Sequence, residues 1–231
     1  MLSKTLQLMT PYLDIHTHHE LQTTDVQTIR SFSMTKEIFE LTPKIPNISI
    51  GLHPWYLTEE NFKENFTYLE VTAKQTHVRL IGECGLDKLK GMEIHSQLKA
   101  FEQQIKLAEE VSKPVIIHCV KAFEELMSLK KRMKPNVPLI IHGFQKKAAL
   151  AERLIRQGFY LSFGAGIFHN PSIAEFIRKQ QLFFLETDDS IYRIQEIYDK
   201  VAEIKEITID ELKELIAQNW KEMGIFQSHS M

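Results

Sequence analysis

Short apolar runs alternate with longer amphipathic segments along most of the chain. The apolar runs predict eight strands, at residues 12–15, 26–32, 47–52, 78–82, 115–117, 138–141, 159–163 and 182–185. Many of these runs lack strict alternation of apolar and polar residues, which is typical of strands that are buried on both faces of a sheet. Strand, helix and strand in repeated succession indicate parallel strands that are joined by crossover connections.

The segments between the runs carry the apolar spacing of helices. The clearest helix spans residues 96–111, where one apolar stripe is formed by Leu98, Phe101, Ile105 and Ala108. Further helices are expected at 59–74, 123–132, 148–156, 172–179 and, in two pieces, between 195 and 223. Thr58 and Thr208 are the expected N-caps, and Gly158 is an expected C-terminal cap.

Eight strands with this connectivity predict a (β/α)8 TIM barrel. The helices after residue 195 would form a C-terminal extension of a slightly distorted barrel. An open doubly wound sheet would give the same pattern, because periodicity does not report closure. The sequence has no low-complexity linker, so one domain over residues 1–231 is expected.

Composition narrows the class of protein. A hydrophobic content of 43%, a charged content of 25% and a net charge of −2 are ordinary for a globular chain and predict no overall attraction to nucleic acid or acidic membranes. Cys84 and Cys119 lie in apolar runs and are expected to be buried thiols. No apolar run approaches the roughly 20 residues of a membrane span, and no signal peptide is recognised. A cytoplasmic monomer or weak oligomer without a membrane partner is expected.

The first apolar run ends in two histidines, His16 and His18. Alternate residues of a strand point to the same side, so these imidazoles project together, about 6 to 7 Å apart. That spacing allows both to reach one metal ion. Alone, the pair is ambiguous between a metal site and a coincidence of surface histidines.

Four later runs end in further residue types that bind divalent metals: Glu83, His118, His142 and Asp188. The active site of a TIM barrel lies at the C-terminal ends of its strands, so all six side chains are expected to meet there. Six ligands exceed the needs of one tetrahedral zinc and suit two divalent ions. Glu83 is the expected bridge between them, and zinc is the first expectation, with magnesium or manganese as alternatives. Such a pair lowers the pKa of a bound water.

Seven motifs follow the strands in order: residues 14–18, Gly51-Leu52-His53-Pro54, Ile81-Gly82-Glu83-Cys84-Gly85-Leu86-Asp87, Pro114-Val115-Ile116-Ile117-His118, Ile141-His142-Gly143-Phe144, Leu161-Ser162-Phe163-Gly164 and Leu185-Glu186-Thr187-Asp188. Over nearly the whole chain they resemble the TatD family of metal-dependent deoxyribonucleases. The resemblance implies a two-metal phosphodiesterase that acts on DNA ends or short single strands, or on another small phosphodiester.

The resemblance also implies roles for the six residues. His16, His18, Glu83 and Asp188 would hold one metal, and Glu83, His118 and His142 would hold the second. Asp188 would receive the proton of the attacking water, so Glu83 and Asp188 are the expected catalytic pair.

Three residues beyond the strand ends are candidates for substrate binding. His53 could assist a leaving group, Lys121 could attract phosphate oxygens, and Phe144 could stack on a nucleobase. Each has a structural alternative: a turn at His53, a solvated lysine, and an aromatic plug in the core.

The loops beyond the ligands depart from the family pattern, so the sequence indicates the reaction type more strongly than the substrate. Residues 88–90, 119–121 and 189–192 differ, and the segment after His18 is shortened. Alternatives are an amidohydrolase that acts on a cyclic amide or ester and a metal-stabilised binding protein with little turnover. Glu83 stands where the amide-cleaving barrels would need a carboxylated lysine, which favours the phosphodiester.

Overall fold

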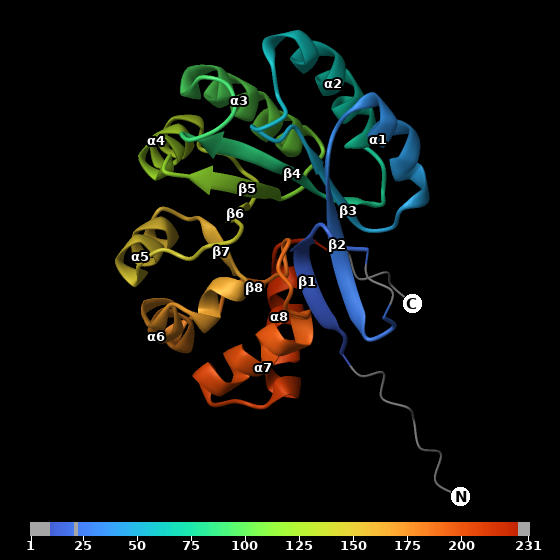
Figure 1. The fold of residues 1–231 in the computed structure, drawn as a ribbon. Coiled ribbons are helices and arrows are strands. Elements are labelled where there is room, and N and C mark those ends of the chain that lie inside the picture. The colour runs from blue at the N-terminus through green and yellow to red at the C-terminus, as the bar shows by residue number, and fades with distance from the viewer. Residues whose placement is uncertain (1–9, 21–22, 226–231) are drawn as a thin grey trace, which may run out of the picture.

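The computed structural model describes residues 10–20 and 23–225. Eight strands form one sheet in chain order, and each pairs in parallel with the next. They are β1 Tyr12–Thr17, β2 Val26–Ser33, β3 Ile48–Gly51, β4 Val78–Asp87, β5 Val115–Val120, β6 Leu139–Ile141, β7 Tyr160–Phe163 and β8 Phe184–Leu185. The strands surround a central core and the helices lie outside them (Figure 1). The predicted (β/α)8 TIM barrel is confirmed.

The helices cover the outside of the barrel. They are α1 Lys36–Leu41, α2 Glu59–Thr72, α3 Ile94–Glu110, α4 Phe123–Met133, α5 Ala148–Arg156, α6 Pro171–Lys179, α7 Ile194–Lys205 and α8 Ile209–Glu222, with 3-10 helices η1 Thr42–Lys44 and η2 Ala165–Phe168. The Thr58 and Thr208 side chains cap α2 and α8 as predicted. Gly158, with a φ of 77°, follows α5. Helix α1 was not predicted, although the Thr35 side chain accepts a hydrogen bond from the Ile38 N–H at its start.

The barrel closes through main-chain contacts between the end of β1 and the residues after β8. The N–H of Asp188 donates to the carbonyl of His16 at 2.9 Å, and the N–H of His18 donates to the carbonyl of Asp188 at 3.1 Å. Thr17 and Asp188 form the corresponding bridge. Because β8 is only two residues long, this closure is made by the segments that carry three of the expected metal ligands.

The connection between β1 and β2 is unusually short for parallel strands, which are normally joined by a dozen or more residues. Tyr12 pairs with Val26, so the chain returns along the whole of β1 within residues 18–25. No helix occurs in the described parts of this connection, 18–20 and 23–25. This agrees with the shortened segment that the sequence indicated.

Two buried glutamines of α3 fix the strand ends that lead to the site. Gln104 accepts a hydrogen bond from the N–H of Leu52 at 2.7 Å. Gln97 accepts from the N–H of Asp87 at 2.7 Å and donates to its carbonyl at 2.9 Å. These side chains stand on the same helix as the buried Phe101. The helix therefore contributes both apolar packing and polar anchors to the C-terminal ends of β3 and β4.

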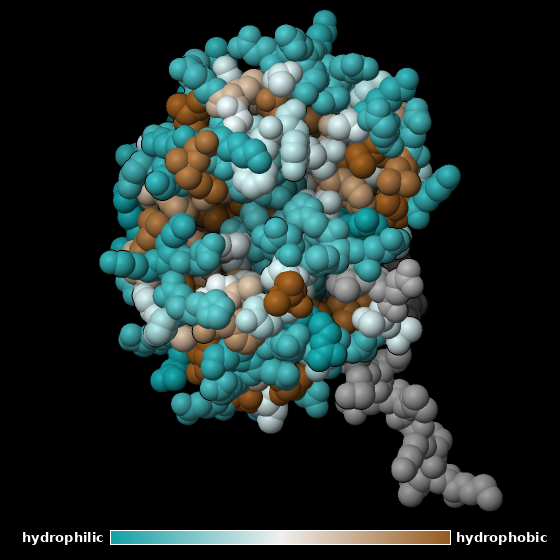
Figure 2. Space-filling view, viewed as in Figure 1, coloured by the Kyte–Doolittle hydropathy of each residue, from teal (hydrophilic) through white to brown (hydrophobic). Residues whose placement is uncertain are grey.

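Two strands are longer than predicted, which changes where their ligands sit. β4 continues to Asp87 and β5 to Val120, so Glu83 and His118 lie inside strands and not after them. Both cysteines are free, and only Cys84 is fully buried. Over the described residues no helix combines the length and apolarity of a membrane span. The face in Figure 2 is mainly hydrophilic, with scattered hydrophobic patches.

Candidate active site

Glu83 lies at the centre of the side chains that gather at the C-terminal ends of the strands. Its Oε2 is 3.4 Å from Nε2 of His16 and 3.5 Å from Nε2 of His18. Its Oε1 is 2.8 Å from both Nδ1 of His118 and Nε2 of His142. The two oxygens of one buried carboxylate thus face two different pairs of histidines. This is the arrangement of donors that a carboxylate between two metal ions requires.

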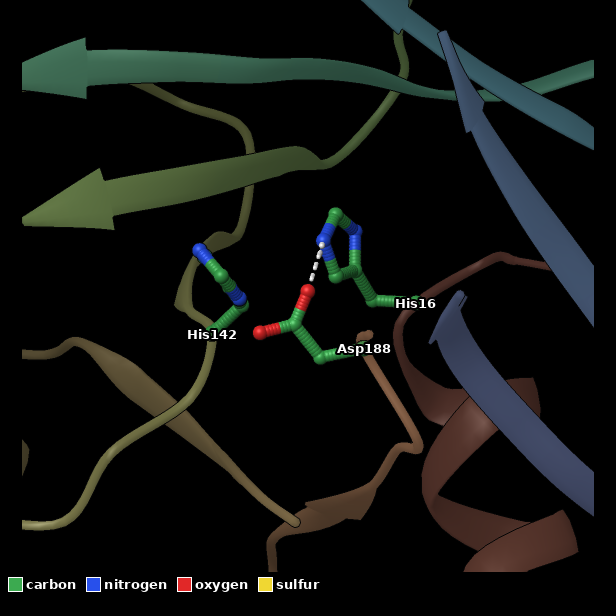
Figure 3. A group of neighbouring side chains, drawn as sticks. All are labelled: His16, His142 and Asp188. Carbon is green, nitrogen blue, oxygen red and sulfur yellow. Dashed lines mark ion pairs between the residues drawn. The ribbon is translucent and has the colours of Figure 1, made fainter. Parts of the chain in front are cut away.

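Asp188 completes the group on the Oε2 side of Glu83. Its Oδ1 is 3.6 Å from Nε2 of His16 and 3.5 Å from Nε2 of His18. Figure 3 shows the side chains of His16, His142 and Asp188 directed toward one another from separate strand ends. The side chain of Asp188 is 34% exposed, whereas that of His16 is fully buried. Asp188 and His18, whose side chain is 44% exposed, are therefore the members of this group that solvent reaches.

Asp14 holds the segment that carries Asp188. This buried carboxylate accepts hydrogen bonds from the N–H and the hydroxyl of Thr187, at 3.1 and 2.6 Å. It also accepts from the N–H of His16 at 3.3 Å. Asp188 itself has a φ of 53°, in the left-handed region, so its backbone conformation costs free energy that these neighbouring contacts offset.

The carboxylates and histidines of this group shift one another's pKa values toward their charged forms. Burial disfavours protonation of His16, but the Asp188 and Glu83 carboxylates outweigh burial and raise its pKa to about 9. Burial also opposes the charged form of Glu83, yet His142 and His118 hold the pKa of this carboxyl well below its usual range. The pKa of Asp188 is lowered by His16 and His142 against the opposing effect of burial.

The donor set fits divalent metal ions. Three groups of nitrogen and carboxylate donors each lie within 4.8 Å of one another, namely His16, His142 and Asp188; His16, His18 and Glu83; and His53, Glu83 and His118. Neither ring nitrogen of the buried His16 makes a hydrogen bond to any described residue. A buried imidazole without a hydrogen-bond partner is costly unless another ligand satisfies it. Imidazole and carboxylate together suit zinc and manganese.

The two metal-ligand candidates on the Oε1 side of Glu83, His118 and His142, each have a second carboxylate behind them. His118 Nε2 lies 3.2 Å from Oδ2 of Asp87. His142 Nδ1 is 3.4 Å from Oε1 of Glu186, a contact that is too weak in geometry to count as a hydrogen bond. Glu186 Oε1 also accepts from the N–H of Gly143 at 2.6 Å. Sequence reasoning assigned no role to Glu186 or Asp14, although an acid inside or directly after an apolar run was available as a signal.

A family model described as TatD-related DNase matches residues 14–223. This chain belongs to the TatD family. It is accordingly a metal-dependent hydrolase that acts on ester bonds. An uncharacterised metal-dependent hydrolase of Bacillus subtilis, YabD, is 28% identical over 76% of each chain.

Two further comparisons extend this. The TatD protein of Pantoea ananatis, named a 3'-5' ssDNA/RNA exonuclease, is 35% identical over 41% of this chain and 36% of its own. The crystal structure of YJJV, a TatD homologue of Escherichia coli, is similar in fold, with a TM-score of 0.76 at 20% identity over 92% of this chain and 97% of that one.

In this TatD family member His53 joins the centre as a hydrogen-bond donor. Its Nδ1 accepts a hydrogen bond from the N–H of Trp55 at 3.1 Å, so a neutral ring carries its proton on Nε2. That nitrogen lies 3.1 Å from Oε1 of Glu83. Burial lowers the pKa of His53, which favours this neutral form. Sequence reasoning placed His53 near the substrate, and the structure places it against Glu83.

A cavity of about 260 Å³ opens beside the metal-ligand candidates. Its lining includes His118, His142, Asp188, Phe144, Phe123 and Lys146. Phe144 is buried in this wall, 3% exposed. Lys121 is exposed and is not part of the lining, so the structure does not bring it to the cavity, whereas Lys146 is there.

Two of the lysines beyond the strand ends already have partners within the protein. Lys88 pairs with Glu125 at 2.6 Å. Lys90 places its Nζ 3.7 Å from the centre of the Trp55 ring. Trp55 in turn donates its indole N–H to Oδ2 of Asp87 at 2.6 Å. The loops after β3 and β4 are therefore joined to each other next to His118.

Proposed function

We propose that this protein is a two-metal phosphodiesterase that cleaves DNA or another small phosphodiester. The observation that carries the proposal is the division of the histidines between the two oxygens of Glu83. His16, His18, Asp188 and Glu83 Oε2 would hold one divalent ion, and His118, His142 and Glu83 Oε1 the other. Zinc is the first expectation for this donor set, with manganese or magnesium as alternatives. Bound in this way, two such ions supply a water of lowered pKa and positive charge beside the phosphodiester oxygens.

The residues of the chain divide the remaining work. Asp188 accepts the proton of the attacking water, because its carboxylate is the more exposed of the two and its lowered pKa keeps it ionised. Glu83 stays buried and ionised and would hold both ions, one with each carboxylate oxygen. His53 donates a hydrogen bond from Nε2 to Glu83 Oε1. This bond keeps Oε1 directed toward the metal position that His118 and His142 would share.

The substrate would bind in the cavity beside His118 and His142. Phe123, with the buried Phe144 against its ring, offers an apolar wall on which a nucleobase can pack, and Lys146 offers a cation to a phosphate oxygen. Lys121 lies outside the lining of the cavity, so it would contact a phosphate farther along the nucleic-acid strand. The name of the Pantoea ananatis relative supports a single-stranded nucleic acid as the substrate.

The proposal is tested by metal analysis followed by reconstitution. Bound metal is quantified, the protein is stripped with a chelator, and Zn²⁺, Mn²⁺ or Mg²⁺ is returned. Each form is assayed on end-labelled single-stranded DNA, a chromogenic phosphodiester and a dihydro-ring amide. Metal-dependent cleavage of DNA without amide cleavage supports the proposal. Glu83→Gln should lose activity, whereas Glu93→Gln, outside the centre, should keep it. Full phosphodiesterase activity in Glu83→Gln, or cleavage of the amide alone, would contradict the proposal.

A further inference from the structure

Asp87 is a buried carboxylate, 3% exposed, that stands behind His118 on the side away from Glu83. It accepts three hydrogen bonds: from the indole N–H of Trp55 at 2.6 Å, from the N–H of Leu89 at 2.7 Å and from Nε2 of His118 at 3.2 Å. An ionised carboxylate has no proton to donate, so Nε2 of His118 must carry the hydrogen. Nδ1, which faces Glu83 Oε1 at 2.8 Å, is then the ring nitrogen that can give its lone pair to an ion on that side.

The position of Asp87 is fixed from several sides. Gln97 binds its main-chain N–H and carbonyl. The indole of Trp55 is held in turn by Lys90, which lies over its ring. The two loops also approach closely, because a side chain at Gly91 would begin 2.2 Å from the carbonyl of Pro54. These contacts therefore fix Asp87 as a support for the His118 ring.

The other metal-ligand candidates lack this support. His142 has a carboxylate behind it at 3.4 Å, without a hydrogen bond, and His16 Nδ1 makes no hydrogen bond to any described residue. His118 is thus the metal-ligand candidate whose ring a carboxylate holds by a hydrogen bond, and it faces Glu83 Oε1. A carboxylate behind a ligating imidazole fixes its tautomer and orientation and raises metal affinity.

We propose that Asp87, held in place by Trp55, is the positioning residue that selects Nδ1 of His118 as a ligand atom and so controls occupancy of the second metal position, on the Oε1 side of Glu83. The inference rests on the proposed function, because it needs two metal positions. It concerns the affinity of one position and not the reaction, so it can be tested without any substrate.

The experiment is a zinc titration of the stripped protein in competition with a fluorescent chelator. Wild type should bind two equivalents. Asp87→Ala should weaken one of them by about 10- to 100-fold and leave the other within about threefold. Trp55→Phe keeps an aromatic ring but loses the indole N–H, so it should weaken the same equivalent by less. Tyr56→Phe, which changes a hydroxyl on the adjacent aromatic of the same loop, is the matched control and should bind as wild type does.

Double variants show which of the two metal positions binds the zinc equivalent that Asp87→Ala weakens. In a His142→Ala background the remaining equivalent should be insensitive to Asp87→Ala, and in a His16→Ala background it should remain sensitive. Asp87→Asn preserves the size of the side chain but has one acceptor oxygen for three donors, so it replaces Asp87→Ala if that variant does not fold. Thermal unfolding of the metal-free proteins checks folding.

The outcomes separate this inference from the proposed function. If wild type binds two equivalents and folded Asp87 variants bind both with wild-type affinity, or weaken both equally, the positioning role is wrong. If wild type binds fewer than two equivalents, the two-metal proposal fails, and the role of Asp87 fails with it.

Discussion

The peptide N–H of Asp188 donates a hydrogen bond to the carbonyl of His16 at 2.9 Å, and the side chains of the same two residues meet at 3.6 Å. The main-chain contact closes the barrel between β8 and β1. The side-chain contact places a carboxylate beside a buried imidazole at the candidate metal centre. Closure of the fold and assembly of the centre therefore depend on the same pair of residues.

Metal removal is accordingly expected to loosen this closure. A ligand present at a hundredfold its Kd stabilises a protein by about 2.7 kcal/mol, which for a chain of this size corresponds to a Tm shift of about 5 to 10 °C. Chelation should lower the Tm by this amount and increase hydrogen exchange at the N–H groups of Asp188 and His18. Calorimetry and exchange mass spectrometry measure both effects.

The control for this prediction is the double variant His16→Ala and His18→Ala. Its Tm should respond to zinc and to the chelator less than that of wild type, because only the position at His118 and His142 remains. If the chelator shifts this variant as much as wild type, the stabilising metal is bound elsewhere in the protein.

Asp14 is expected to be essential to the same closure. Asp14→Ala leaves the buried N–H and hydroxyl of Thr187 and the N–H of His16 without this acceptor. Unsatisfied buried donors cost about 1 to 3 kcal/mol each, and partial relaxation makes a total of about 2 to 4 kcal/mol reasonable. Urea denaturation of the metal-free protein measures the loss. Asp25→Ala, on the exposed connection before β2, should keep the wild-type midpoint, and equal midpoints for the two variants would refute the role of Asp14.

Sequence reasoning succeeded where a residue type and its place in a strand carry the information. The order of strands followed from apolar runs. The structure also brings together His16, Glu83 and Asp188, which stand out in the sequence as polar residues in or directly after these runs. Their mutual distances depend on barrel closure, which no local pattern encodes. Asp87 illustrates the limit: its bond from the Leu89 N–H lies within its own loop. Its contact with His118 depends on the register between β4 and β5, which becomes visible only in three dimensions.

Tyr198 is expected to anchor α7 to the barrel. Its buried hydroxyl accepts a hydrogen bond from the N–H of Leu13 and donates one to the carbonyl of the same residue, both at 3.1 Å. Tyr198→Phe removes both bonds and should lower the free energy of unfolding by about 1 to 3 kcal/mol. Tyr160→Phe is the matched control, because this half-buried tyrosine of β7 has no hydroxyl hydrogen bond to the described residues. A Tyr198→Phe variant as stable as the control would show that the two bonds contribute nothing.

Because of Lys113, we expect the free energy of unfolding to rise with pH in the alkaline range. Its half-buried ammonium donates to the carbonyls of Ala73 and Gln75, at 2.5 and 2.8 Å, just beyond the end of α2. Burial, with a smaller contribution from Arg79, lowers the pKa of Lys113 to about 8, against an ordinary value near 10.5. Between these two pH values the unfolded chain binds more protons than the folded one, so the free energy of unfolding increases as pH rises through 8.

The size of this effect is limited by solvent, because the ammonium is only partly buried. The full interval would correspond to roughly 3 kcal/mol, and screening reduces the expected gain to about 1 kcal/mol. The measurement is the difference in urea midpoint between wild type and Lys113→Met, taken at intervals from pH 7 to 9.5. Subtracting the variant cancels other groups that titrate in this range. The urea midpoint of wild type should rise relative to that of Lys113→Met as pH rises. A constant or shrinking difference would mean that the Lys113 ammonium is not destabilised by burial.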